Sequence, residues 1–294
     1  MNDLYQAAAI PLSKKAKNGT VYVQGSPVNY YDSGSSEVSS FSRDPIVLVH
    51  GTGGNAQLHY GYLFPILELN QRVIALDFSP VPGKDEVTLE DLENQITRVI
   101  EHLLPDTPVT LVGYSLGAVA VASVAAKRPD LVRNLVLIAG WMKTDVQQSL
   151  RNSVWQDLYQ SGSKTLADFT LYCAFSHAFY TMLPPEHLRI MREKIRPTAF
   201  DAQQMALNRR IDISDQIGRI RARTLIVGCR QDQMVPLWHS KLLFGAIDDA
   251  RYQEIDSGHG VVFERPGQLS QMVDQFNENP ARFPAGSIVP ADHP

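Results

Sequence analysis

The sequence contains little cysteine. Only Cys173 and Cys229 occur among its 294 residues. Two cysteines are too few for a disulfide framework, and no Cys-x-x-Cys or His-x-x-x-His spacing offers a metal site. We therefore expect both thiols to be buried as small apolar side chains, and we expect neither a metal nor another cofactor.

The sequence also lacks long runs of one charge and long apolar runs. The formal net charge is -4, so nothing favours binding to phosphate backbones or anionic membranes, and no nucleic-acid partner is expected. No stretch approaches the roughly 20 apolar residues that cross a bilayer. The first ten residues show no cationic start followed by an apolar core, so we expect a cytoplasmic protein without a membrane span.

The composition is that of a large globular domain. Hydrophobic residues make up 44% and charged residues 20% of the chain, whose length allows one domain plus an insertion. Apolar runs without alternation predict strands, and helical segments separate them. Such strands indicate a parallel sheet covered by helices on both faces, the α/β class. The strands are expected at 46–49, 72–76, 109–112, 135–139, 224–228 and 252–255, with a hairpin at 21–31 and helices at 58–69, 88–103 and 116–127.

The pattern changes between residues 141 and 215, where strand-like runs vanish and aromatic-rich helical segments take over. We interpret this segment as a helical lid inserted into a core formed by residues 20–140 and 216–280. Residues 33–40 form a polar, turn-rich stretch. The Pro-rich residues 281–294 are expected to be a flexible C-terminal tail.

The most informative motif is Gly-Tyr-Ser-Leu-Gly at 113–117, which lies between an apolar strand and a helix. Flanking glycines allow the sharp turn that lifts a serine hydroxyl out of a sheet. The motif therefore predicts Ser115 as a nucleophile and the backbone N–H of Leu116 as an oxyanion donor.

A nucleophilic serine needs a base and an acid, each in a loop after a later strand. His259 follows the last predicted strand and suits the base, because a neutral imidazole can accept and return a proton. Asp232 follows the strand at 224–228 and is the candidate acid, with Asp256 and Asp145 as alternatives. The hypothesis is acylation of Ser115, then water attack, with His259 serving both halves.

The remaining histidines have simpler interpretations. His50 is expected to tie loop backbone together, His59 and His177 could reach the pocket, and His102 is expected to be solvated on an amphipathic helix.

Lid aromatics are expected to roof an apolar cleft over Ser115 that accepts a moderately sized acyl or alkyl group. The lid aromatics are Trp141, Trp155, Tyr172, Phe175, Phe179 and Tyr180, and the residues predicted to bind substrate are Tyr114, Trp141, Phe175, Phe179 and Met234.

A competing hypothesis uses the glycine loop at 51–56. Gly-Thr-Gly-Gly-Asn-Ala after a strand, with Asp77 further on, fits a dinucleotide-binding fingerprint and would make the protein an oxidoreductase. This interpretation leaves the 113–117 motif and His259 without a role.

The chain resembles the α/β-hydrolase superfamily, in its lid-bearing, esterase-like and haloperoxidase-like branch. The resemblance covers residues 46–266 and includes His-Gly-Thr-Gly-Gly at 50–54, Gly-Cys-Arg-Gln-Asp at 228–232, and Gly-His at 258–259 with Glu-Arg-Pro at 264–266. It implies that the Thr52 backbone N–H joins that of Leu116 in an oxyanion hole. Many relatives carry Asp-x-x-Gly-x-Gly after the third core strand, whereas residues 77–83 here contain two prolines, which stiffen that edge of the pocket.

The resemblance implies a serine hydrolase that cleaves a carboxylic ester, lactone or thioester of a moderately apolar small molecule. The same fold also serves acyl transfer, carbon–carbon bond hydrolysis and cofactor-free haloperoxidase-like chemistry, so these alternatives stay open. A homodimer also stays open, because the sequence does not fix the oligomeric state.

Overall fold

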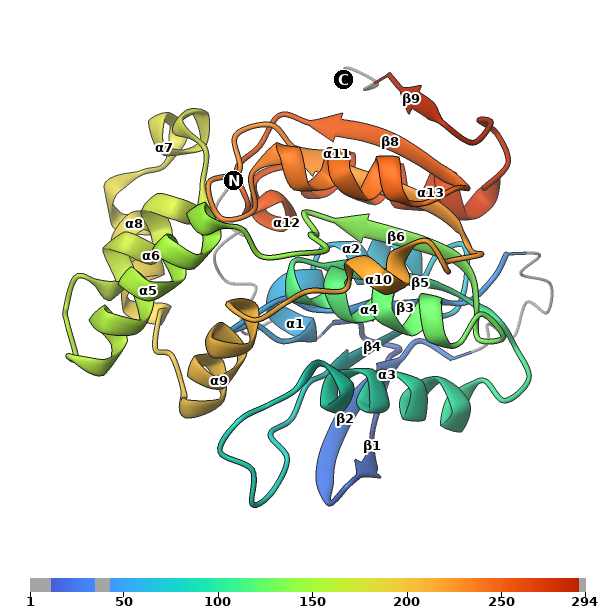
Figure 1. The fold of residues 1–294 in the computed structure, drawn as a ribbon, viewed down its shortest axis with the longest axis horizontal. Coiled ribbons are helices and arrows are strands. Elements are labelled where there is room, and N and C mark those ends of the chain that lie inside the picture. Colours follow the sequence, from blue (N-terminus) through green and yellow to red (C-terminus); the bar gives the residue numbers. More distant parts are fainter. Residues whose placement is uncertain (1–11, 35–42, 291–294) are drawn as a thin grey trace.

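The computed structural model describes residues 12–34 and 43–290, so residues 1–10 and most of the serine-rich stretch lie outside the described part. Within it, nine strands form one sheet in the order β1-β2-β4-β3-β5-β6-β7-β8-β9 (Figure 1). The strands are β1 (Lys17–Val23), β2 (Ser26–Asp32), β3 (Ile46–Val49), β4 (Val73–Asp77), β5 (Val109–Tyr114), β6 (Val132–Ile138), β7 (Arg223–Cys229), β8 (Ala250–Ile255) and β9 (Ser287–Val289).

The sheet is parallel except at one edge. β1 and β2 form an antiparallel hairpin, and β2 runs antiparallel to β4. The hairpin turns at Gln24 and Gly25, both with positive φ, which suits the twist of a two-residue hairpin loop. From β4 to β9 every pairing is parallel, so the carboxyl ends of these strands meet at a single edge of the sheet.

Helices cover both faces of the sheet because the core strands are apolar on both sides. Val47 and Val49 of β3 belong to the core layer with α3 (Leu89–Leu103), α4 (Leu116–Lys127), α10 (Ser214–Ile217) and α11 (Leu237–Ala246). Ile46 and Leu48 of the same strand face the opposite layer. That layer contains α1 (Ala56–Tyr60), α2 (Leu63–Leu67), α12 (Val261–Glu264) and α13 (Pro266–Glu278).

Five of the six helices between β6 and β7 form what we call the helical insertion. They are α5 (Val146–Gln160), α6 (Leu166–Ala174), α7 (His177–Met182), α8 (Pro185–Lys194) and α9 (Ala199–Asn208). They lie to one side of the sheet (Figure 1). The segments that lead into and out of the insertion are hydrogen-bonded to each other. The Thr144 amide donates to the Ile211 oxygen at 2.9 Å, and the Ile213 amide donates to the Met142 oxygen at 2.7 Å. The insertion is therefore joined to the core at one place.

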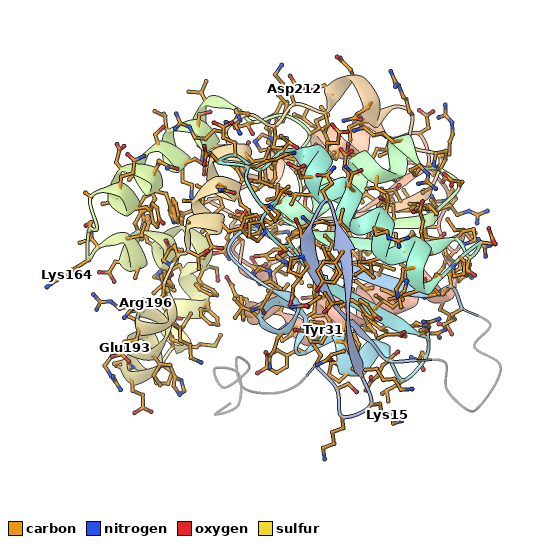
Figure 2. The ribbon with its side chains drawn as sticks, turned by 90° about the horizontal axis from the view of Figure 1, so that it is seen from below. Lys15, Tyr31, Lys164, Glu193, Arg196 and Asp212 are labelled. Carbon is orange, nitrogen blue, oxygen red and sulfur yellow. The ribbon has the colours of Figure 1, made fainter. Side chains whose placement is uncertain are left out.

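The predicted strands and the hairpin are all present, and two features differ from the sequence analysis. The single helix expected at 58–69 is two short helices, α1 and α2, with Gly61 and Tyr62 between them. The Pro-rich tail contains β9, which the sequence did not predict and which pairs with β8. Figure 2 views the molecule from the side of the β1–β2 hairpin, with Tyr31 of β2 labelled.

Three simpler expectations can also be compared with the structure. Cys173 and Cys229 are both free and buried, as expected. Helix α3 begins at Thr88, whose hydroxyl accepts from the Asp91 amide while the Asp91 carboxylate accepts from the Thr88 amide. None of the helices in the described ranges is both long and apolar enough to cross a membrane.

Candidate active site

Ser115 alone makes the turn between a strand and a helix. β5 ends at Tyr114 and α4 begins at Leu116. Ser115 has a φ of 56° and a ψ of −121°, a backbone conformation that residues other than glycine rarely adopt. Its amide donates to the Ile138 oxygen of β6 at 2.9 Å, which fixes the turn to the sheet. Such strained backbone persists where the surroundings enforce it, and it occurs often at functional sites.

Two glycines allow this turn by close packing. A Cβ added to Gly117 would lie 2.2 Å from the Val49 oxygen, and one added to Gly113 would lie 2.4 Å from the Gly117 oxygen. No side chain fits at those distances, so α4 begins directly against the end of β3. This packing brings the loop after β3 next to the serine, where a Cβ on Gly51 would lie 2.9 Å from the Ser115 Cβ.

The structure brings Ser115, His259 and Asp232 together. His259 Nε2 lies 2.9 Å from Ser115 Oγ, and His259 Nδ1 lies 2.7 Å from Asp232 Oδ2. All three residues are buried, and each lies in a loop after a parallel strand: β5, β7 or β8. The carboxylate accepts a hydrogen bond from the Nδ1–H group of His259. Nε2 therefore carries no proton and can accept the proton of the serine hydroxyl.

The alternative acids have other partners. Asp256 Oδ1 accepts from Gln231 Nε2 at 2.8 Å. Asp145 accepts from the Gln148 amide at the start of α5 and contacts His239 Nε2 at 3.1 Å. The second oxygen of Asp232 accepts from the Met234 and Val235 amides, both at 2.8 Å. Of the three candidates, Asp232 is the one that faces His259, and its carboxylate is held on both sides.

Two buried histidines hold the loop that follows β3. His50 Nε2 accepts from the Phe78 amide at 3.0 Å, so Nδ1 carries the proton that is donated to the Gly51 oxygen at 2.8 Å. His59 Nδ1 accepts from the Gly51 amide at 3.2 Å. Burial lowers the pKa of His50 and lowers that of His59 well below its usual value. Both rings are therefore neutral supports for the loop, and the predicted role of His50 agrees with these contacts.

Helix α9 of the insertion also holds this loop. The Gly53 amide donates to Gln204 Oε1 at 2.9 Å, and Asn208 Nδ2 donates to Thr52 Oγ1 at 2.9 Å. Sequence reasoning missed both residues, because nothing in a helix shows which distant loop its amide side chains will meet. Within the described ranges, the backbone amides of Thr52 and Leu116 donate to no protein acceptor.

A cavity of about 510 Å³ lies over Ser115, between the core and the insertion. Of the residues predicted to bind substrate, Tyr114, Trp141, Phe175 and Met234 line it. The Tyr114 hydroxyl also donates to the His259 oxygen at 2.8 Å, so this residue supports the histidine loop. The prediction that Phe179 binds substrate is corrected, because Phe179 is not among the residues that line the cavity. Its ring stacks instead on Phe175, with ring centroids 4.7 Å apart.

The other residues singled out in the sequence are divided between cavity and surface. Trp155 and His59 line the cavity. Tyr172 and His177 are exposed, and the Tyr180 hydroxyl donates to the Leu171 oxygen. His102 is exposed on α3. The pocket side of the insertion is therefore formed by only part of its aromatic set.

The dinucleotide hypothesis requires Asp77 to face a ligand. Instead, Asp77 Oδ1 accepts from the Ala56 amide at 2.7 Å and Oδ2 from the Tyr31 hydroxyl at 3.0 Å. Desolvation and the neighbouring carboxylate raise the pKa of Tyr31 to about 12, so this hydroxyl stays protonated and donates. Asp77 thus anchors the start of α1. Over the part of the chain that the structure describes, no three His, Cys, Asp or Glu side chains are placed to hold a metal ion.

Comparison with known proteins identifies one fold family and several related hydrolases. The family described as alpha/beta hydrolase fold matches residues 44–266. The chain is 30% identical over 240 residues to a pyrrolizixenacetamide deacetylase of Xenorhabdus hominickii, covering 79% of this chain and 90% of that protein. It is 25% identical over 276 residues to a 2-hydroxy-6-oxo-6-phenylhexa-2,4-dienoate hydrolase of Comamonas testosteroni, covering 85% and 90%.

Solved structures agree on the fold. An alpha/beta hydrolase enzyme from a Medee basin deep-sea metagenome library superposes with a TM-score of 0.79 at 19% identity, covering 89% of this chain and 98% of that one. The predicted fold class, a mostly parallel sheet with helices on both faces, is confirmed.

Proposed function

The chain belongs to the α/β-hydrolase fold family, and we propose that it is a serine hydrolase acting through an acyl-enzyme. Its substrate is a carboxylic ester or a related acyl compound, such as a lactone or thioester, of a moderately apolar small molecule. The observation that carries this proposal is the hydrogen-bonded series from Ser115 through His259 to Asp232 on a strained turn beneath the cavity.

The geometry supports a two-step reaction. Ser115 Oγ attacks the carbonyl carbon while His259 Nε2 takes its proton, and the Thr52 and Leu116 amides donate to the oxygen that becomes negative. His259 then returns the proton to the leaving alcohol or thiol, and the acyl group stays on Ser115. A water molecule repeats the attack through the same base, and the acid leaves with Ser115 restored.

The lining of the cavity favours an apolar acyl or alkyl group. Trp141, Trp155, Phe175 and Met205 form apolar walls above the serine. Polar side chains, among them Gln148, Asn152 and Asn208, line other parts of the cavity. Pockets that combine apolar walls with polar side chains bind by apolar contact, while the polar groups fix the orientation of the ligand.

The proposal is tested with 4-nitrophenyl esters of short and medium acids. Wild type should hydrolyse them and react with a fluorophosphonate probe, whereas Ser115→Ala should lose several orders of magnitude in kcat and all labelling. Ser161→Ala removes an exposed hydroxyl at the end of α5 and should behave like wild type. Labelling or near-native turnover in Ser115→Ala would overturn the assignment.

A second candidate is amide hydrolysis, favoured by the likeness to the pyrrolizixenacetamide deacetylase. An amide nitrogen leaves only when protonated, and His259 can supply that proton after taking it from Ser115. Comparing 4-nitrophenyl acetate with 4-nitroacetanilide separates the two, since the acyl group is the same and only the leaving group differs.

A further inference from the structure

Arg151 is the cationic side chain of α5 that lines the cavity. It lies one turn before Trp155, between the insertion helices and the space over Ser115. Its Nη1 donates to Asn152 Oδ1 at 2.8 Å and approaches Met205 Sδ at 3.7 Å. Its Nε is buried and has no hydrogen-bond partner among the described residues.

No described carboxylate forms an ion pair with Arg151. Arginines elsewhere in the described ranges do pair with acids, such as Arg72 with Asp32 at 2.6 Å and Arg192 with Asp168 at 2.6 Å. Burial lowers the pKa of Arg151, while contact with Cys173 and the charge of Asp232 act in the opposite direction. A guanidinium nevertheless stays charged in proteins, so this cation is held in the cavity with no carboxylate in direct contact to offset its desolvation.

The rest of the cavity does not supply the missing charge. Lys194 and Arg196 also line it, whereas the one carboxylate among its described lining residues is Asp201. Arg196 follows α8 on the insertion (Figure 2), and its Nη1 donates to the carbonyl oxygens of Arg192 and Ile195. The Asp201 carboxylate accepts from the Thr198 amide at the start of α9. The cavity is thus cationic within a chain whose net charge is -4.

We infer that Arg151 binds a carboxylate of the substrate, so that the preferred substrates are acyl compounds that carry a second, ionised acid group. The inference rests on the proposed hydrolase function and adds a substrate class to it. Nη1 is used by Asn152 and Met205 and Nε is buried, so we assign the contact with the substrate to the part of the guanidinium that lines the cavity. A guanidinium stays charged and carries several N–H donors, and its hydrogen bonds to a carboxylate are stronger than those between neutral groups.

Two matched pairs of esters test this subsite, and the measured quantity is the ratio of kcat/KM between the two esters of a pair. In the first pair, 4-nitrophenyl hexanoate is compared with the mono-4-nitrophenyl ester of adipic acid, which carries a carboxylate at the far end of the acyl chain. In the second, 4-acetoxytoluene is compared with 4-acetoxybenzoate, which carries it on the leaving group. The ratio of kcat/KM within a pair cancels any general loss of activity or folding.

In wild type, at least one pair should favour the carboxylate ester, and Arg151→Met should lower that ratio by about 10- to 100-fold, the usual effect of losing charged hydrogen bonds. Arg151→Lys keeps the charge but loses the planar set of N–H donors, so its ratio should lie between those of wild type and Arg151→Met. Arg189→Met, which removes an exposed cation of α8 paired with Glu193, should leave the ratio as in wild type.

Binding without turnover separates this inference from the proposed function. Monomethyl adipate should bind Ser115→Ala more tightly than methyl hexanoate by calorimetry, and adding Arg151→Met should remove the difference. Failure of wild type to hydrolyse any ester would reject the proposed function while this binding comparison still decides the subsite. If neither ester ratio nor the binding difference depends on Arg151, the subsite is rejected, and the guanidinium serves only to join α5 to α9.

Discussion

Asp232 holds its position through both carboxylate oxygens. Oδ2 lies 2.7 Å from His259 Nδ1, and Oδ1 accepts two backbone amides of its own loop. The amides fix the orientation of the carboxylate, and the carboxylate in turn fixes which nitrogen of His259 carries the proton. Asp256, only three residues before His259 in the sequence, bonds instead to Gln231.

Asp232→Asn should therefore lower kcat for 4-nitrophenyl esters by about 10⁴-fold, because an amide can present its NH₂ group to Nδ1 and reverse the tautomer. The matched variant Asp256→Asn should stay within about twofold of wild type, since an exposed hydrogen bond contributes little. Steady-state kinetics of both purified variants measure this. A large loss in Asp256→Asn with activity retained in Asp232→Asn would reverse the assignment of the acid.

Helix α9 connects the insertion to the glycine loop that supplies the Thr52 amide. Gln204 is buried and accepts a hydrogen bond from the Gly53 amide, one residue beyond the proposed oxyanion donor Thr52. Asn208 donates to the hydroxyl oxygen of Thr52. The insertion thus lines the cavity and also fixes the backbone of the glycine loop, which lines the cavity from the core. We regard Gln204 as a positioning residue, because it acts through Gly53.

Gln204→Leu should lower kcat by about 10- to 100-fold with a smaller change in KM, since loss of one oxyanion donor costs roughly 100- to 1000-fold and a loosened loop costs part of that. Gln203→Leu makes the same change one residue earlier on α9, where the structure gives no such contact, and should retain wild-type kcat. Equal losses in the two variants, or a change confined to KM, would show that α9 acts by packing alone.

The elements also show what the sequence could predict. Core strands such as β3 and β5 are mostly apolar runs, so local pattern predicted them, and Ser115 and Asp232 could be placed because each follows such a strand. His259 follows β8, whose sequence Ala-Arg-Tyr-Gln-Glu-Ile is mixed, and it could be placed because it comes after the last predicted strand. The contacts of Gln204 and Arg151 depend on how the insertion folds back over the sheet, and no local pattern encodes that. Likewise β9 is a three-residue strand whose pairing with β8 depends on the edge it meets.

At the scale of the whole molecule, the histidines buried beneath the cavity link stability to pH. His50 and His59 lie between the sheet and the glycine loop, and burial lowers the pKa of each. In the unfolded chain both would titrate near the usual value of about 6.5. Below that pH the unfolded state binds more protons than the folded state, so the free energy of unfolding should fall as the pH falls.

Each such histidine lowers the free energy of unfolding by about 1.4 kcal/mol for each pH unit of acidification. This holds in the pH range where the ring is protonated in the unfolded chain and neutral in the folded protein. Urea denaturation at pH 7.5, 6.0 and 5.0 should show stability decreasing towards acid. His59→Gln should reduce the slope between pH 6.0 and 5.0 by about 1.4 kcal/mol per pH unit, since it removes one histidine whose pKa is lowered by burial. Burial also lowers the pKa of His239, which is present in both proteins and does not affect the difference between them. His102→Gln changes an exposed histidine on α3 and should leave the slope as in wild type. An unchanged slope in His59→Gln would mean that the folded protein protonates this ring, and its role as a neutral acceptor for the Gly51 amide would then be wrong.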